Sequence, residues 1–208
     1  MSSQTILGID RMEMAAKMDS HETSKITTHW ICEKWPEETC AWAREFLDRK
    51  YNRRFEAVKF QVGISSELLR KFAPKSVEVV EVPGNLLLNE GIQMMLDLVL
   101  GAGGTTAYNA ANSQMGVGDS ATAEAATQTD LQAATNKLYK AMNATYPSRA
   151  AQTLSFQSDF TTAEANWVWN EWTIRNGATS DKNMNRKVAS LGTKSTGTWT
   201  LTGQVTLA

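Results

Sequence analysis

Apolar residues recur at three- and four-residue steps after Pro36, the spacing that places side chains along one side of a helix. Proline at a first helical position, followed by two glutamates in the first turn, is typical of a helix start. We therefore predict a helix from about Pro36 to about Phe55. Its apolar side comprises Cys40, Ala43, Phe46, Leu47, Tyr51 and Phe55.

Three further elements are predicted before residue 105. Ser66–Phe72 has the pattern of a short helix that ends before Pro74, because the residue preceding a proline avoids the helical conformation. Alternating valines predict a strand over Ser76–Val82. An amphipathic helix follows over about Asn85–Leu100, and the glycines after it favour the left-handed conformation that closes a helix. The apolar face of that helix contains Leu88, Ile92, Met95, Leu96 and Val99.

Beyond residue 105 the pattern changes to period two, which is typical of half-buried strands. Candidate strands span residues 113–118, 136–142, 152–160, 166–175, 184–191 and 196–207. Turn-forming Gly, Asn and Ser separate them, which favours an antiparallel arrangement. The fold class predicted is therefore α+β, with a mostly antiparallel, jelly-roll-like β-sandwich.

Composition divides the chain near Pro83-Gly84, which is also a turn signal. Charged side chains make up 26 of the first 82 residues but only 17 of the remaining 126, whereas threonines rise from 5 to 18. We interpret this change as a boundary between two modules. Residues 1–82 would form a charged, partly helical attachment module, and residues 83–208 the sandwich with its leading helix.

Global properties exclude several classes of protein. The formal net charge of −1 over 208 residues provides no field that would attract nucleic acid or an anionic membrane. The most apolar stretch, residues 86–100, contains four polar residues and is shorter than a bilayer span requires. The first residues lack the basic flank and apolar run of a signal peptide, so we expect no export by that route. Two cysteines are too few for a disulfide scaffold and indicate a reducing compartment.

The sequence contains few residues arranged for catalysis. The chain has two histidines, and neither accompanies a nucleophile signature; no phosphate-binding loop is present, and Gly116-Val117-Gly118-Asp119 is better explained as a bend after a strand. The only carboxylate pair that can be nominated for glycoside hydrolysis, Asp119 with Glu171, has no supporting motif. We therefore expect no enzyme activity and no cofactor.

Four potential zinc ligands occur in the first module: His21, His29, Cys32 and Cys40. Their spacing lacks the close-set ligand pairs of ordinary zinc fingers, so buried or idle thiols and imidazoles are the favoured interpretation. A disulfide between the two cysteines is the other alternative. The basic run formed by Arg44, Arg49, Lys50, Arg53 and Arg54 is interleaved with acids, which favours a solvated helix face over a phosphate-binding stripe.

Tryptophans are the main candidates for contact residues, because they supply large contact area at low entropic cost. In a regular strand, Trp167 and Trp169 would face opposite to Trp172, so one of the two faces is expected to be the sandwich core. The other face would serve as a subunit contact or as a platform for a glycan. Core packing and docking are the alternatives for the tryptophans of the first module, which are Trp30, Trp35 and Trp42.

The segment GVGDSATAEAATQTDLQA, residues 116–133, resembles a phrase common in virion proteins of tailed bacteriophages. In that phrase a G-x-G-(D/T)-(S/G) turn precedes a small-residue segment ending in T-x-L. The resemblance continues through residues 136–140, 169–174, 185–188 and 199–202, and covers about residues 85–208. It is similar to the family of minor capsid, decoration and fibre-associated proteins of phages infecting actinobacteria.

The resemblance implies a non-enzymatic virion protein, made in the host cytoplasm and carried on the capsid surface. We expect a capsid decoration or minor capsid protein that binds and stabilises the lattice of the major capsid protein and self-associates around symmetry axes. Trp30, Trp35 and Trp42 are then candidates for lattice docking, and Trp167 and Trp169 for a subunit or ligand face. The alternative is a tail fibre or baseplate component that contacts host glycan. In both cases no contact with membrane or nucleic acid is expected.

Overall fold

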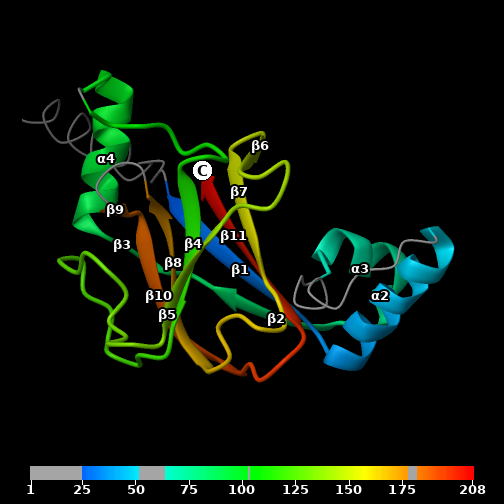
Figure 1. The fold of residues 1–208 in the computed structure, drawn as a ribbon. Coiled ribbons are helices and arrows are strands. Elements are labelled where there is room, and N and C mark those ends of the chain that lie inside the picture. Colours follow the sequence, from blue (N-terminus) through cyan, green and yellow to red (C-terminus); the bar gives the residue numbers. More distant parts are fainter. Residues whose placement is uncertain (1–24, 52–63, 103, 178–181) are drawn as a thin grey trace, which may run out of the picture.

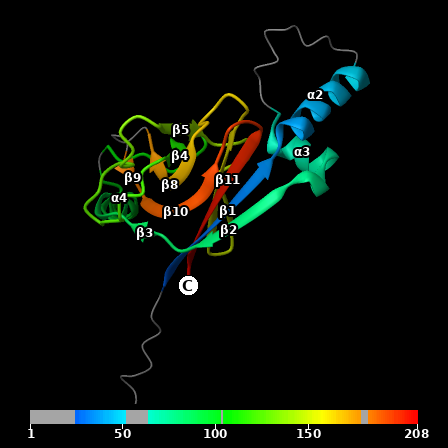
Figure 2. The same ribbon diagram turned by 90° about the horizontal axis from the view of Figure 1, so that it is seen from below.

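The computed structural model describes residues 25–51, 64–102, 104–177 and 182–208. Two antiparallel sheets pack against each other in an α+β fold, which confirms the predicted fold class (Figures 1 and 2). The first sheet has the order β2 (Glu78–Pro83), β1 (Ile26–Trp35), β11 (Thr198–Leu207), β7 (Thr153–Phe160) and β6 (Ser148–Ala150). The second has the order β3 (Leu86–Leu87), β10 (Asn185–Thr193), β8 (Val168–Asn176), β4 (Ser113–Gly118) and β5 (Lys137–Ala141), and β9 (Lys182–Asn183) pairs with β8.

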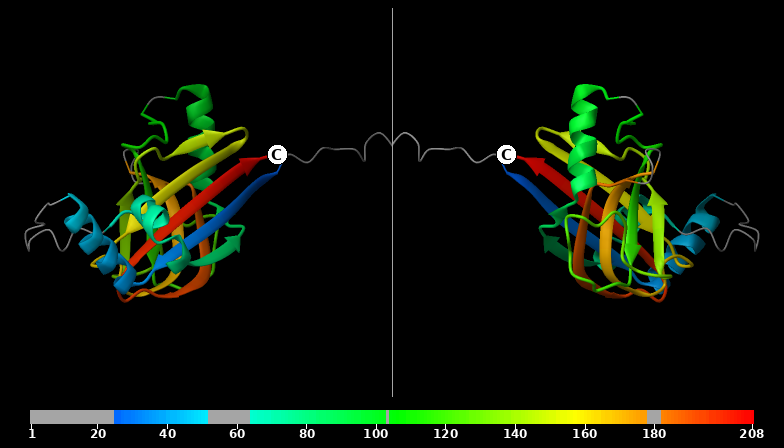
Figure 3. Two further views of the ribbon diagram at one scale, coloured as in Figure 1. Left: turned by 90° about the vertical axis from the view of Figure 1, so that its right-hand side faces the viewer. Right: turned by 90° about the vertical axis from the view of Figure 1, so that its left-hand side faces the viewer.

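The helices lie on different sides of this sandwich. Helices α2 (Glu37–Tyr51) and α3 (Ser66–Phe72) accompany the first sheet, and a short 3₁₀ turn (Pro74–Ser76) leads from α3 to β2. Helix α4 (Asn89–Leu100) lies beside the second sheet and contacts β9. Figure 3 shows the two sides, with α2 and α3 toward the viewer in the left view and α4 in the right view.

Six predicted strands are present, with ends shifted by at most two residues. The helices are confirmed too: α2 begins after Pro36 as predicted, while its expected end at Phe55 lies outside the described residues. Helix α4 begins at Asn89 rather than Asn85, because the preceding residues form β3 and pair with β10. Gly101 closes α4 in the left-handed conformation, with φ 63°.

Strand β1 was not predicted, and it changes the relation between the two expected modules. Its ten residues pair with β11 from Ile26↔Leu207 to Trp35↔Thr198. Strand β2 then pairs with the other edge of β1. The composition change near Pro83 therefore falls at the end of a strand of the first sheet, and this sheet is built from both halves of the chain.

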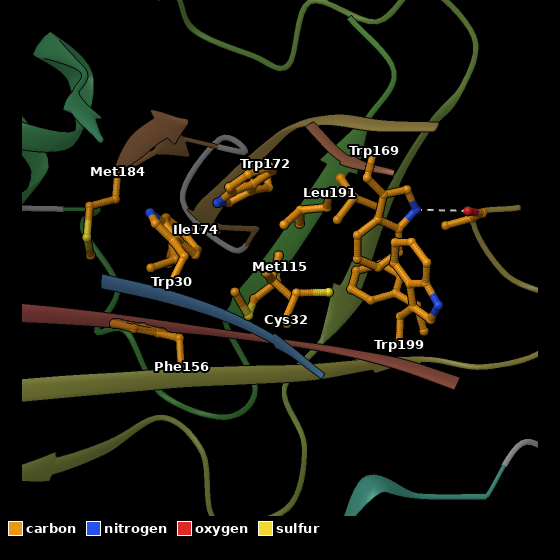
Figure 4. Close-up of a cluster of buried hydrophobic side chains, with 14 of the residues drawn as sticks. Trp30, Cys32, Met115, Phe156, Trp169, Trp172, Ile174, Met184, Leu191 and Trp199 are labelled. Atoms are coloured by element: carbon orange, nitrogen blue, oxygen red, sulfur yellow. Dashed lines mark hydrogen bonds between the residues drawn. The ribbon is translucent and has the colours of Figure 1, made fainter. Parts of the chain in front are cut away.

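The main core fills the space between the sheets and is rich in tryptophan (Figure 4). Trp30 from β1 contacts Trp172 from β8 edge to face, with ring centroids 6.0 Å apart. Trp169 lies between Phe160 and Trp199, at centroid distances of 4.8 and 5.0 Å. Each such aromatic pair adds about 0.5–1.5 kcal/mol beyond the burial of apolar area.

A smaller second core joins α2 and α3 to the outer face of the first sheet. Trp35 lies at an odd spacing from Trp30, so it points to that outer face, as expected for the alternation of a strand. Its partners are Cys40, Ala43, Ile64 and Leu69. The two helices are thereby packed on the first sheet.

Candidate docking surfaces

The five tryptophans predicted as contact residues have different environments. Trp30, Trp35 and Trp169 are at most 1% exposed, and Trp167 is partly buried against the main core. Trp42, in contrast, is 45% exposed. The buried three are therefore core residues of this chain, and only Trp42 presents a large apolar surface to solvent.

The expected opposition of Trp169 and Trp172 is wrong. Both side chains lie in the main core. They are three positions apart, and an odd spacing would place them on opposite faces of a regular strand. The pairing of β8 with β10 shifts register between Val188↔Glu171 and Gly192↔Trp169, so the ladder is irregular in the stretch between the two tryptophans. Trp169 also donates from Nε1 to the carbonyl of Ala165, at 2.9 Å. A glycan platform formed by Trp167 and Trp169 is consequently not present.

The exposed side of α4 forms the first of two apolar surfaces. We call it the α4 stripe and define it as Ile92, Leu96, Val99 and Leu100, which are 40%, 58%, 85% and 79% exposed. The spacing of its first three members, i, i+4 and i+7, places them on one helix face.

The opposite side of α4 explains why the stripe faces outward. Gly91 and Met94 are buried there. A Cβ atom at position 91 would lie only 2.2 Å from the carbonyl oxygen of Met184, so this glycine lets the helix backbone approach the strands closely. Glu90 accepts the backbone N–H of Asn183 at 2.7 Å and holds the helix in the same orientation. The close approach at Gly91 and the hydrogen bond of Glu90 therefore orient α4 on the strands.

The second apolar surface is aromatic and lies on α2 and α3. We call it the Trp42 patch, defined as Trp42, Phe46 and Phe72. Trp42 and Phe46 are stacked at a centroid distance of 5.5 Å, and Phe72 is 5.3 Å from Phe46. A shallow hollow of about 290 Å³ adjoins it, lined by Glu38, Thr39, Trp42, Phe72, Ala73 and Ser76.

Polar anchors hold the Trp42 patch in place on the sheet. Asp159 of β7 accepts the backbone N–H of Ser66 at 2.8 Å, and Arg70 of α3 forms an ion pair with Glu33 of β1. At the start of α2, Glu37 accepts hydrogen bonds from Thr162, Thr196 and the backbone of Gly197 and pairs with Arg44. Although burial opposes ionisation, these bonds hold the pKa of Glu37 below its ordinary value.

The segment that carries the phage resemblance, residues 116–133, begins at the end of β4 and continues into the long loop before β5. A fully buried ion pair holds it against the second sheet: Glu171 Oε2 accepts from Arg186 Nε at 2.7 Å. The Glu171 carboxylate also accepts the backbone N–H groups of Gln132 and Ala133, at 2.9 and 2.7 Å. Arg186 donates further to the Thr122 carbonyl, at 2.9 Å.

These contacts argue against the catalytic pair nominated from sequence. Glu171 is 0% exposed, and both of its oxygens are occupied by structural hydrogen bonds. Asp119 accepts from the side chain of Asn136 at 2.7 Å. A general acid must reach substrate, and the buried Glu171 cannot. Glu171 is therefore a structural residue.

Of the four residues considered for zinc, the three that the structure describes do not form a ligand cluster. Cys32 is in the main core and Cys40 in the smaller one, and both thiols are free, so no disulfide joins them. Burial raises the pKa of Cys32 to about 12 and also raises that of Cys40, which keeps both as protonated thiols. His29 lies 3.2 Å from Glu81, and His21 is outside the described residues. In the part of the chain that the structure describes, no group of three or more His, Cys, Asp or Glu residues could hold a metal ion.

The predicted solvated face of α2 has local partners in the structure. Arg44 pairs with Glu37, and Arg49 pairs with Glu45 one turn away; Arg53 and Arg54 are outside the described residues.

None of the helices in the described ranges is long and apolar enough to span a membrane. Among the described residues, the α4 stripe and the Trp42 patch are the surfaces that we consider for macromolecular contact. Comparison of the chain with known protein families, curated proteins and solved structures found no match.

Proposed function

We propose that this chain is a non-enzymatic structural protein of a tailed-phage virion, a capsid decoration or minor capsid protein that binds the major capsid protein. The observation that carries the proposal is the presence of two apolar surfaces on different sides of one firmly packed sandwich (Figure 1). The resemblance of residues 85–208 to virion proteins supports the same role. The proposed partners are proteins, with no contact to membrane or nucleic acid.

The two surfaces suit two kinds of contact. Contiguous exposed apolar side chains usually mark sites of association, and tryptophan is enriched among the residues that dominate binding energy. The Trp42 patch, an aromatic cluster beside a hollow, fits docking to the capsid protein. The four side chains of the α4 stripe are all apolar, so a second copy of the stripe can bury them across a symmetry axis.

Weak contacts of this kind are sufficient on a particle. The stripe spans little more than two helical turns, so its burial alone is smaller than the roughly 1,200–2,000 Å² of a stable interface. On a lattice, each copy that docks brings its neighbours to a high effective concentration, which raises the avidity without any new contact. We therefore propose that self-association occurs mainly on the particle.

Fractionation of purified particles tests the location. Tail-free heads and free tails are separated on a density gradient, and the protein is quantified in each by mass spectrometry. Many copies on heads are the expected result. Recovery only with tails would overturn the capsid proposal and favour the alternative, a fibre or baseplate component that contacts host glycan, and absence from both fractions would refute a virion role.

Variants test the docking surface. Heads that lack the protein are incubated with purified full-length chain, and binding is measured by cosedimentation. Trp42→Ala should weaken binding at least tenfold, because truncation of a central aromatic residue costs about 2 kcal/mol or more. Leu207→Thr changes an exposed apolar side chain at the end of β11 that belongs to neither surface, and it is the matched control. Equal binding by both variants would show that the Trp42 patch is not the docking surface.

A further inference from the structure

Lys194 is a buried lysine whose nearest hydrogen-bond partners are uncharged. It follows β10 and is 0% exposed. Its Nζ donates to the carbonyl oxygen of Thr161 and to the Oδ1 of Asn166, each at 2.8 Å. Lysine is almost never fully buried unless it is paired with a carboxylate, since a buried ammonium group loses its hydration. The site therefore disfavours the charged ammonium form relative to water.

The acid–base properties of the group agree with this environment. Burial lowers the pKa of Lys194 to about 8, against the opposing effect of Glu164 and other nearby groups. About one molecule in ten then carries a neutral Lys194 at pH 7. A neutral amine has a free electron pair and is a nucleophile.

The Asn166 carboxamide is positioned as the matching electrophile. Its Oδ1 accepts from Lys194, while its Nδ2 donates to the carbonyl of Thr162 at 2.8 Å, so the orientation of the amide group is defined. The carbonyl carbon lies one C=O bond, about 1.2 Å, from Oδ1 and is therefore close to Nζ. Asn166 is exposed, so a leaving group released from it reaches solvent directly.

The turn that contains Asn166 also contains the carboxylate of Glu164. Glu164 Oε2 accepts from the backbone N–H and the Oγ1 of Thr161, at 2.8 and 2.9 Å, and Glu164 Oε1 pairs with Lys140. Thr161 thus binds Glu164 through its N–H and hydroxyl groups and Lys194 through its carbonyl. Although burial opposes ionisation, the bonds from Lys140 and Thr161 hold the pKa of Glu164 below its ordinary value, so it is a proton acceptor at neutral pH.

From this geometry we propose that Lys194 and Asn166 form an intramolecular isopeptide bond without any enzyme or cofactor. The neutral Nζ attacks Cγ of Asn166, the new C–N bond forms, and the Cγ–Nδ2 bond breaks. Glu164 accepts the proton lost from Nζ and delivers it to the departing nitrogen, which leaves as ammonia. One amide replaces another, and no oxidant or reductant is required.

The bond would join the turn before β8 to the turn before β11. Both turns also bind Glu37, through Thr162 and Thr196, so the cross-link would lie beside the start of α2. Closing a covalent loop between residues 166 and 194 restricts the unfolded chain and stabilises the folded one. The reaction depends only on the folded chain, so its failure would leave the proposed virion role untouched.

Intact-mass spectrometry of the purified full-length chain tests the proposal. The expected mass is about 17 Da below that of the sequence, the mass of one ammonia lost in the amide exchange. Peptide mapping should recover a branched peptide that contains both Lys194 and Asn166. The full sequence mass after prolonged incubation of the folded protein at pH 8 would overturn the proposal.

Variants separate this reaction from other losses of ammonia. The Asn176-Gly177 pair can lose the same mass by cyclising, but that loss would persist in Lys194→Met and Asn166→Ala, whereas the isopeptide bond would be absent from both. Asn166 is exposed, so Asn166→Ala should fold even where Lys194→Met does not. Glu164→Gln should slow bond formation at least tenfold if the carboxylate relays the proton. A wild-type mass deficit no larger than that of Asn166→Ala, or a peptide map without the Lys194–Asn166 branch, would refute the assignment.

Discussion

Replacing Arg186 by methionine removes one partner of the fully buried ion pair that holds the β4–β5 loop. The guanidinium group donates to Glu171, to Gln128 Oε1 at 3.0 Å and to the Thr122 carbonyl at 2.9 Å. Methionine fills much of the same volume with no donor. The variant therefore leaves the Glu171 carboxylate buried with only its two backbone N–H partners.

The expected loss of stability is large for a single substitution. Hydrogen bonds from a charged group are worth about 1.5–3 kcal/mol each, but the desolvation of Arg186 itself offsets part of their sum. Breaking a buried pair by removal of one partner costs about 3–5 kcal/mol, because an uncompensated charge remains. We expect a loss in that range, a substantial fraction of the roughly 5–15 kcal/mol that stabilises a typical native protein.

Urea denaturation at pH 7, followed by tryptophan fluorescence, measures the free energy of unfolding. Arg149→Met is the matched control, since Arg149 is exposed, and it should change stability by less than about 0.5 kcal/mol. The double variant Glu171→Gln/Arg186→Met removes the buried charge as well, so it should be at least about 1 kcal/mol more stable than Arg186→Met alone. A loss below about 1 kcal/mol for Arg186→Met, or no recovery in the double variant, would refute the assigned role of the pair.

Three further substitutions test other parts of the structure. Leu96→Glu should change the free energy of unfolding by less than about 0.5 kcal/mol, because the side chain is exposed. It should nevertheless lower the number of copies that bind per head in the cosedimentation assay, and unchanged occupancy would exclude the α4 stripe. Gly116→Ala should cost about 1–3 kcal/mol in urea denaturation, because its Cβ would lie 2.4 Å from Cε1 of Tyr139, and a neutral effect would contradict that close packing. In Asn166→Ala, Lys194 remains a free amine, and its pKa is about 8 in the folded chain but about 10.4 in the unfolded chain. Between these two pH values the unfolded chain binds more protons than the folded chain, so the free energy of unfolding should rise with pH. We expect a rise of about 1–2 kcal/mol after allowance for solvent screening. The same pH series on Asn166→Ala/Lys194→Met should be flat by comparison, and parallel curves would show that Lys194 does not titrate in this range.

Local patterns were sufficient to predict most elements of this fold. Strand β4 was predicted at its observed bounds, since a short alternating segment ending in glycine has few other interpretations. Strand β1 was missed although Thr28, Trp30 and Cys32 alternate with exposed or partly exposed residues and are buried. Its assignment required a partner, β11, that lies more than 160 residues away in the chain, and no local pattern reports such a pairing.

The contact residues were harder to predict, because tryptophan is suited to both cores and interfaces. Strand alternation could have placed Trp30 and Trp35 on opposite faces, but only the packing of α2 and α3 on the outer face shows that both are buried. The α4 stripe was visible as an apolar helix face. Which part of that face is buried depends on Gly91, whose lack of a side chain turns the helix toward β9 and leaves Leu96 exposed.

The buried Glu171–Arg186 pair relates the segment that resembles phage proteins to the fold rather than to a docking surface. The phrase at residues 116–133 supplies backbone groups that this pair binds, and its glycines allow close packing: a Cβ at Gly118 would lie 2.5 Å from Glu171 Oε1. In this chain, the residues of the segment serve the fold, because they form a loop that one carboxylate and one guanidinium group hold against the second sheet. The α4 stripe and the Trp42 patch lie outside it. Two proteins that share the phrase would thus be expected to share the sandwich, while their docking partners would be determined by residues that the phrase does not include.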